Sequence, residues 1–142
     1  MDSTPFPYRI IDHTADLGII VRGSNKKNLF IHAALAMTDL MVKGNKCNKK
    51  VARDVIVEGV DFPDLMVKWL GEILYLFAGE KLIADSIVIN YLNQTQLRAT
   101  ITFIIFESNH HEILREIKAV TYHQISVRKI DDEWEAKIIF DI

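Results

Sequence analysis

The chain has 142 residues, of which 49% are hydrophobic and 25% are charged, and its formal net charge is −2. A chain of this size forms one domain, expected here over residues 1–142, and buries about 70% of its unfolded surface without disulfides or metals. The weakly acidic balance disfavours a protein that binds nucleic acid by itself, because such proteins usually carry a basic surface.

The sequence also indicates a compartment. Cys47 is the only cysteine, so no intrachain disulfide can form, and the sequence has no Cys/His zinc pattern. Residues 1–8 resemble neither a signal peptide nor a transit peptide, and no apolar run approaches the ~20 residues that span a bilayer. We therefore expect a cytoplasmic protein that does not associate with membranes.

The first third of the chain predicts two strands and a helix. Residues 8–11 and 17–22 have strand character and flank an acidic pentapeptide at 12–16, which we expect to form a turn or corner. A helix follows between Ser24, the expected N-cap, and Gly44, the expected stop. Its apolar residues recur at steps of three and four: Leu29, Phe30, Ala33, Ala34, Met37, Leu40 and Met41.

A second helix is expected after a strand at 51–57. Asp61 is its expected N-cap, Pro63 lies in the first turn, and Gly79 ends it. Its apolar stripe is continuous along one face: Leu65, Met66, Trp69, Leu70, Ile73, Leu74 and Phe77.

The remainder of the chain predicts strands joined by short turns. The strands are expected at 83–91, 96–106, 119–127 and 134–140. Asn93-Gln94 and Asp131-Asp132 mark hairpin turns, and residues 110–116 are expected to be helical or irregular. The fold class is therefore α+β, a mostly antiparallel sheet of about six strands with two amphipathic helices packed on it.

Two acidic segments lie at strand ends. Asp16 closes the pentapeptide, and Asp141 and Ile142 follow the last strand. If these strands lie side by side, both aspartates converge with the terminal carboxylate of Ile142, and Ca²⁺ and Mg²⁺ prefer such oxygen ligands. Taken singly, Asp12 and Asp16 are more typical of turn residues, and Asp141 of a solvated strand end. The spacing alone leaves both interpretations open.

Residues 118–123 are the other unusual stretch, because they mix polar groups with a strand pattern. In a strand, Lys118, Val120 and Tyr122 share one face. A lysine at a strand start is usually solvated, but if Lys118 points towards the acidic segments it could contact a phosphate or a carboxylate.

The histidines give a weaker signal. His13 is interpreted as a ligand, an acid/base or a packed histidine, and the last is the commonest fate of an isolated histidine. His110 and His111 are interpreted as an exposed pair, and His32 as structural. The sequence also lacks a Gly-x-Ser-x-Gly elbow, a phosphate-binding loop and a Cys-His nucleophile pair, so it does not indicate a conventional enzyme.

Several motifs occur together, in one order, from the first expected strand to the last residue. They are DHTADLGI at 12–19, Leu29-Phe30 with Ala33-Ala34, DLMVKWL at 64–70, KAVTYH at 118–123, and the terminal Asp141-Ile142. On these motifs the sequence resembles the archease family. The two segments at 12–19 and 118–123 are the most specific part of the resemblance.

The resemblance implies a function that composition does not indicate. Archeases are protein cofactors of the GTP-dependent RNA ligase that joins tRNA halves in tRNA splicing. That ligase guanylylates its own histidine, activates an RNA 3′-phosphate and seals it to a 5′-hydroxyl. By this resemblance the chain is not itself an enzyme, but speeds guanylylation and sustains multiple turnover, with RNA contacted only through the ligase.

The resemblance also implies a site. Carried over residue by residue, the family's metal ligands fall on Asp16, Asp141 and Ile142, with Ca²⁺ as the leading cation and Mg²⁺ or Mn²⁺ as alternatives. Lys118 matches the lysine that the family needs for activation. The chain departs from the family pattern at Ile105-Phe106-Glu107, where an aromatic residue stands in place of an expected glycine, and the following loop at 108–116 is short.

Two other functions remain open at this level. One is a metal-dependent phosphoryl-transfer enzyme or nuclease, with Asp12, Asp16 and Asp141 as ligands and His13 as acid/base. It predicts hydrolysis by the protein alone. The other is a chaperone-like nucleic-acid adaptor, which predicts binding that survives loss of the acidic residues.

Overall fold

The computed structural model describes residues 8–13, 16–44 and 49–142, except for the side chains of Asp12 and His13. Within these ranges it has ten strands and two helices. The strands are β1 (Tyr8–His13), β2 (Asp16–Gly23), β3 (Val42–Gly44), β4 (Lys50–Glu58), β5 (Leu82–Leu92), β6 (Gln96–Ile105), β7 (His111–Ile113), β8 (Ala119–Val120), β9 (Ser126–Ile130) and β10 (Glu133–Asp141), and the helices are α1 (Lys26–Met41) and α2 (Phe62–Glu80).

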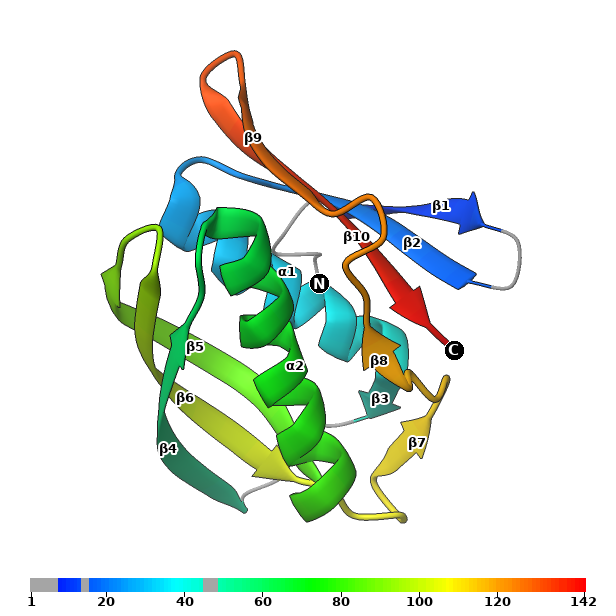
Figure 1. Ribbon diagram of the computed structural model, residues 1–142. Coiled ribbons are helices and arrows are strands. Elements are labelled where there is room, and N and C mark those ends of the chain that lie inside the picture. The colour runs from blue at the N-terminus through cyan, green and yellow to red at the C-terminus, as the bar shows by residue number, and fades with distance from the viewer. Residues whose placement is uncertain (1–7, 14–15, 45–48) are drawn as a thin grey trace.

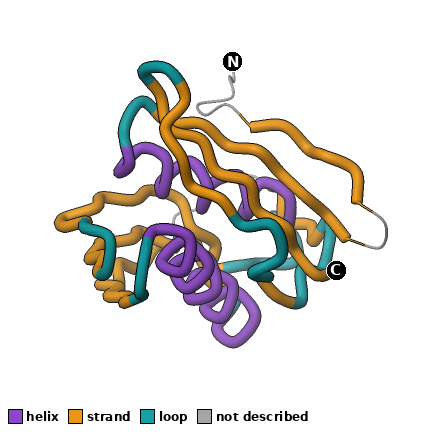
Figure 2. The backbone as a smooth tube through the Cα atoms, turned by 45° about the horizontal axis from the view of Figure 1, so that its top comes forward, coloured by secondary structure: helices purple, strands orange, loops and turns teal. Residues whose placement is uncertain are grey.

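The two helices lie between two antiparallel sheets (Figure 1). The larger sheet has the order β1-β2-β10-β8, with β9 also paired to β10, and the smaller has the order β4-β6-β5. Helix α1 contacts β2 and β10 on one side and β5 on the other, which makes the centre of the molecule a layer of helices between layers of strands (Figure 2). A separate pair, β3-β7, lies at one end.

The expected α+β class is confirmed, but the strands form three sheets rather than one sheet of about six strands. Period-2 patterns identify strands without saying which strands pair, so the division into sheets could not be predicted. Each helix buries residues against both larger sheets, and this explains why α1 has apolar residues on most of its circumference.

At the centre, the buried indole of Trp69 in α2 donates a hydrogen bond to the carbonyl oxygen of Phe30 in α1 at 2.8 Å.

The start of α2 is as predicted, whereas the cap of α1 is not. The Asp61 carboxylate accepts a hydrogen bond from the Asp64 amide at 2.9 Å, with Pro63 in the first turn. In α1 the N-cap is Asn25, not Ser24, because the Asn25 side chain accepts from the Asn28 amide at 2.8 Å. Ser24 Oγ accepts instead from the Asn28 side chain.

Both helices end away from the predicted glycines. Helix α1 ends at Met41, because Val42 is already extended and enters β3 with Gly44. Helix α2 continues through Gly79 to Glu80 and ends at Lys81, which has a left-handed φ of 59°. The Lys81 amide donates to the carbonyls of Leu76 and Phe77, so its hydrogen bonds compensate for a conformation that glycine would adopt more easily.

The prediction was also wrong at two strands. The expected strand at 119–127 is divided into β8 and β9 by a turn in which Gln124 has a φ of 53°. Residues 111–113, expected to be helical or irregular, form β7 and pair with β3. The two predicted hairpin turns are confirmed: Asn93 Oδ1 accepts from the amides of Thr95 and Gln96, and Asp131 lies between β9 and β10 with a φ of 55°.

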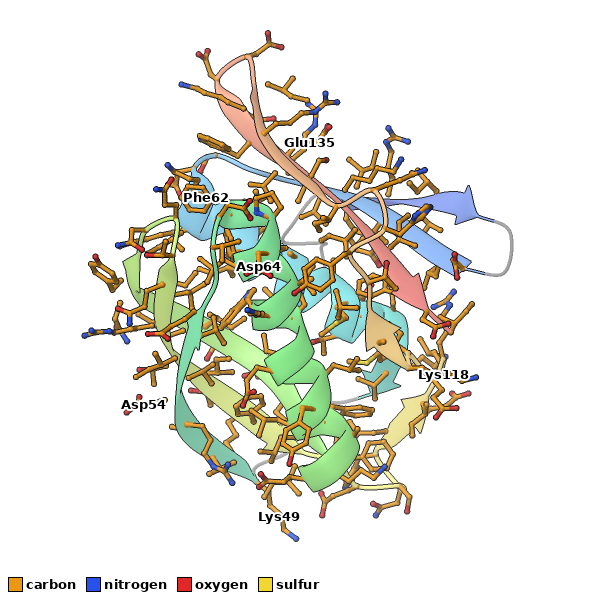
Figure 3. All side chains as sticks on the ribbon, viewed as in Figure 1. Lys49, Asp54, Phe62, Asp64, Lys118 and Glu135 are labelled. Atoms are coloured by element: carbon orange, nitrogen blue, oxygen red, sulfur yellow. The ribbon has the colours of Figure 1, made fainter. Side chains whose placement is uncertain are left out.

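A side-chain hydrogen bond fastens the turn after β8 to the start of α2. The Tyr122 hydroxyl donates to Asp64 Oδ1 at 2.7 Å, and Lys68 lies 3.3 Å from Asp64 Oδ2. This hydrogen bond lowers the pKa of the Asp64 carboxyl, with help from the Val60 amide, and raises the pKa of the Tyr122 hydroxyl. Figure 3 shows Asp64 at the upper end of α2.

No helix in the described part of the chain has the length and apolar composition required to cross a membrane.

Replacing Gly71 with alanine is expected to raise the free energy of unfolding by about 0.5–1 kcal/mol. Gly71 lies inside α2, and a Cβ there would meet no heavy atom within 4 Å, so the methyl group restricts the unfolded chain without a clash. Urea denaturation followed by circular dichroism measures the change. As a control, Gly23→Ala should destabilise, because its Cβ would lie 2.4 Å from the Leu29 amide nitrogen. A Gly71→Ala protein no more stable than wild type would contradict this interpretation.

Tyr122→Phe is expected to reduce stability in a pH-dependent manner. The folded pKa of Asp64 is lower than in the unfolded chain, so the contribution of this carboxylate is complete above about pH 4 and is lost as pH falls through the folded pKa. The raised pKa of Tyr122 preserves the hydroxyl until pH exceeds about 10. The difference in melting temperature between the wild type and Tyr122→Phe should therefore be constant from about pH 5 to pH 9 and should disappear in acid. A difference that persists at the lowest pH would argue against the hydrogen bond.

Candidate functional site

The pairing of β2 with β10 places the two predicted acidic residues side by side. Asp16 lies directly opposite Asp141 in the antiparallel register, at the end of the ladder. Residues directly opposite each other project from the same face of a sheet, with Cβ atoms about 4.5–5.5 Å apart. The predicted convergence of Asp16 and Asp141 is therefore confirmed at the level of the sheet.

Lys118 reaches the same end of the sheet through β8. Its amide donates to the Asp141 carbonyl oxygen at 2.7 Å, immediately before Ala119 pairs with Asp141. The Thr121 amide and hydroxyl both donate to the Ile139 carbonyl oxygen, at 3.0 and 2.8 Å, which fixes the other end of β8. Figure 3 shows Lys118 at the start of β8, close to the C-terminal end of β10.

The site is open to solvent and rich in oxygen. Asp16 is half-buried, while Lys118 and Asp141 are exposed and Ile142 is 44% exposed. Like charges directly opposite each other on neighbouring strands are destabilising unless a cation offsets them. A cation bound at the end of β10 would offset the repulsion between these carboxylates.

The described side chains alone do not make a complete set of metal ligands. Over the described residues, no group of three or more His, Cys, Asp or Glu is placed to hold a metal ion. Asp16 and Asp141 supply two carboxylates, and the third ligand expected from the sequence is the terminal carboxylate of Ile142, which is not a side chain. Carboxylate oxygens are the donors that Ca²⁺, Mg²⁺ and Mn²⁺ prefer, so the donor chemistry fits a hard cation.

The pentapeptide contributes two further backbone positions. His13 pairs with Asp16, so its backbone lies in the same row as Asp141, whereas Asp12 pairs with Leu17, in the row of the buried Phe140. The side chains of Asp12 and His13 lie outside the described residues, as do Thr14 and Ala15. Their predicted roles as ligand and acid/base stay predictions.

The other candidate residues do not join this site. His32 Nδ1 lies 2.7 Å from the Arg22 carbonyl oxygen, consistent with a structural role. His111 is buried rather than exposed, because β7 turns its ring onto Phe106, with centroids 5.6 Å apart. Tyr122 is directed to Asp64, since β8 ends at Val120 and the predicted common face with Lys118 is interrupted. Cys47 lies outside the described residues.

Sequence reasoning missed how Lys118 is held. Residues 114–118 connect the end of α1 to the end of β10: the Leu114 amide donates to the Met41 carbonyl oxygen at 2.7 Å, and the Lys118 amide donates to Asp141. Helices leave their last four carbonyls without helical partners, so Met41 is a natural acceptor. The end of the helix could have indicated that a hydrogen-bond donor is needed there. The sequence could not show that Leu114 supplies it.

Comparison with known proteins identifies the family. Residues 8–142 match the model of the Archease protein family (MTH1598/TM1083). The chain is 31% identical to "Protein archease" of Methanosarcina acetivorans over 146 residues, covering 100% of both chains. It is 34% identical to "Protein archease" of Pyrococcus furiosus over 135 residues, covering 92% of this chain and 95% of the relative.

Solved structures agree with this match. The solution structure of Methanobacterium thermoautotrophicum protein 1598 superposes with a TM-score of 0.70 at 26% identity, covering 95% of this chain and 98% of that one. The crystal structure of a Thermotoga maritima archease, described as a possible chaperone, gives a TM-score of 0.66 at 17% identity over 100% of both chains, a likeness of fold alone. The family model spans all three sheets and both helices, up to the end of β10, and the chain belongs to the archease family.

Proposed function

We propose that this protein is an activator of a GTP-dependent tRNA-splicing RNA ligase and that it acts in the cytoplasm without catalysing a reaction of its own. Family membership supports this, because the sequence motifs that imply the activity lie within the matched residues. The single structural observation that supports it best is the end of β10. There Asp16 lies opposite Asp141, and the Lys118 amide binds the Asp141 carbonyl oxygen.

In this proposal Asp16, Asp141 and the carboxylate of Ile142 hold a divalent cation, Ca²⁺ first and Mg²⁺ or Mn²⁺ as alternatives. Such a cation would supply positive charge close to the partner's nucleotide phosphates. Lys118 is exposed and its amide binds the Asp141 carbonyl oxygen, so its side chain would add a second positive charge near the cation. Transfer of a nucleotide to the ligase histidine develops negative charge on phosphate oxygens, and fixed cations stabilise that charge.

The geometry suits a protein that works inside a partner's active site. The carboxylates and Lys118 are carried by β2, β10 and the start of β8, which hydrogen bonds join into one sheet, so their positions do not depend on a long loop. RNA would then be contacted through the ligase, since the chain's net charge of −2 offers no general attraction for phosphates.

Asp16→Asn is expected to reduce activation of the cognate ligase by at least about tenfold, because it removes one carboxylate charge while preserving the side-chain volume. Single-turnover guanylylation with GTP and Mn²⁺, with and without the protein, measures the effect. Asp54→Asn is the matched control, since Asp54 is an exposed aspartate on β4, in the other sheet.

Different outcomes identify different functions. Full activation by Asp16→Asn would contradict the proposed role of this carboxylate. Metal-dependent hydrolysis of RNA by the purified protein alone would indicate the phosphoryl-transfer alternative. An effect on the ligase that needs no guanylylation and survives the substitution would favour a chaperone-like adaptor, the role suggested in the description of the Thermotoga maritima archease.

Extending the chain by Gly-Ser after Ile142 is expected to weaken activation and cation binding together. The extension moves the terminal carboxylate away from Asp141 and adds bulk next to Lys118. Calorimetric titration with Ca²⁺ and the guanylylation assay provide the two readouts, and the same dipeptide placed before Met1 is the control. If both readouts match the wild-type protein, the Ile142 carboxylate is not a ligand.

A further inference from the structure

A groove lies beside the candidate site, between the C-terminal half of α2, the end of α1 and the segment that follows β7. Its volume is about 400 Å³, within the usual range of protein binding pockets. The lining residues come from both helices and from residues 113–117: Met41, Leu74, Phe77, Ala78, Lys81, Ile113, Arg115, Glu116 and Ile117. Figure 1 shows α2 with β7 and β8 alongside its C-terminal half.

The floor and one edge of the groove are apolar. Leu74, Phe77 and Ile117 are each less than 9% exposed and form part of the hydrophobic core. At the edge, Ile113 is 46% exposed and extends the apolar lining to the surface. Apolar hollows with polar residues around them are typical of interaction sites.

The rim is positively charged. Its lining residues include two cations, Lys81 and Arg115, and one acid, Glu116, and in the described part of the chain neither cation has an ion pair with a carboxylate. The Arg115 guanidinium is fixed by a hydrogen bond to the Leu40 carbonyl oxygen at 2.9 Å, and Lys81 Nζ lies 5.8 Å from the centre of the Phe77 ring. Both cations line the groove, but Arg115 also interacts with the Tyr8 hydroxyl, so Lys81 is the main charge that the groove offers an anionic partner.

One wall of the groove is continuous with the candidate site. Ile113 and residues 115–117 line it, and the next residue is Lys118, whose amide binds the Asp141 carbonyl oxygen. The Leu114 amide binds Met41, so the wall is anchored at both ends. A partner segment in contact with Ile117 would therefore lie one residue along the chain from Lys118.

We propose that this groove docks an acidic, amphipathic segment of the partner ligase, with an apolar side chain seated on Phe77 and Ile117 and a carboxylate facing Lys81 and Arg115. The inference rests on the proposed function, because it assigns the surface through which that partner is held. Burial of the apolar edge supplies affinity, while the charged rim favours acidic partners and speeds encounter.

Other occupants fit the charges or the shape less well. Two copies of this chain meeting groove to groove around a two-fold axis would bring two positive rims together, which is unfavourable. A small amphiphilic anion would fill the hollow but would leave the exposed edge at Ile113 uncovered. A chain segment covers both.

The test compares groove variants with matched variants on other surfaces. Ala78→Trp fills the groove from an exposed helical position, and Lys81→Asn removes the charge with a residue that tolerates the left-handed backbone. Val88→Trp adds the same bulk to the 60% exposed Val88 on the smaller sheet, and Lys129→Asn removes a charge from exposed Lys129 on β9. The dissociation constant for the purified cognate ligase is measured by fluorescence anisotropy, with guanylylation followed in parallel.

We expect Ala78→Trp to weaken ligase binding by at least about tenfold and Lys81→Asn by a smaller factor that shrinks at high salt, because screening weakens exposed charge pairs. Both control variants should bind within about twofold of wild type. Saturating amounts of either groove variant should restore the wild-type guanylylation rate, since the end of β10 is unchanged.

Unchanged binding by both groove variants would overturn the inference, as would the absence of any binding by wild type. So would a wild-type dimer that Ala78→Trp dissociates, because the groove would then hold a second copy of the chain. If wild type binds through the groove but does not accelerate guanylylation, the docking surface stands and the proposed activation fails, which separates the two hypotheses.

Discussion

The register between β2 and β10 is the constraint on which the candidate site depends. It brings Asp16 opposite Asp141 and, two positions along, Gly18 opposite Ile139. A Cβ at Gly18 would lie 2.7 Å from Ile11 Cγ1 and 2.9 Å from Ile139 Cδ1, so side chains from both neighbouring strands close over this glycine. A slip of one residue would move every side chain of the strand to the opposite face, bury charge and disrupt this packing.

Packing against the layer of helices explains why β10 stays paired with β2 as far as Asp141. The inward residues of β10, Ala136, Ile138 and Phe140, are fully buried against the helices, while Asp141 immediately beyond them is exposed. Trp69 joins α2 to α1 through a buried hydrogen bond, and each helix also contacts the smaller sheet. The strand end that carries the acidic residues is thus supported by the whole core rather than by local contacts.

The segment between β7 and β8 links three parts of the molecule. It provides donors to carbonyls at the end of α1, forms a wall of the groove and delivers Lys118 to the Asp141 carbonyl oxygen. The two surfaces that this segment joins differ in charge. Arg115 is a cation at the groove, whereas Asp16 and Asp141 are acids at the end of β10. In the proposed function, the groove would hold the partner while the end of β10 presents charged groups to its active site.

The sequence by itself determined the features that local physics controls. These include the α+β class, the capped start of α2 at Asp61 and Pro63, the hairpin turns, and the acidic residues at two strand ends. Tertiary structure decided the division into sheets, the short β3-β7 pair and the left-handed cap at Lys81, because these depend on contacts between distant segments. The same reason applies to the site. Its residue types could be read from the motifs, but only strand pairing places Asp16 against Asp141, and only the α1 terminus and β10 together fix Lys118.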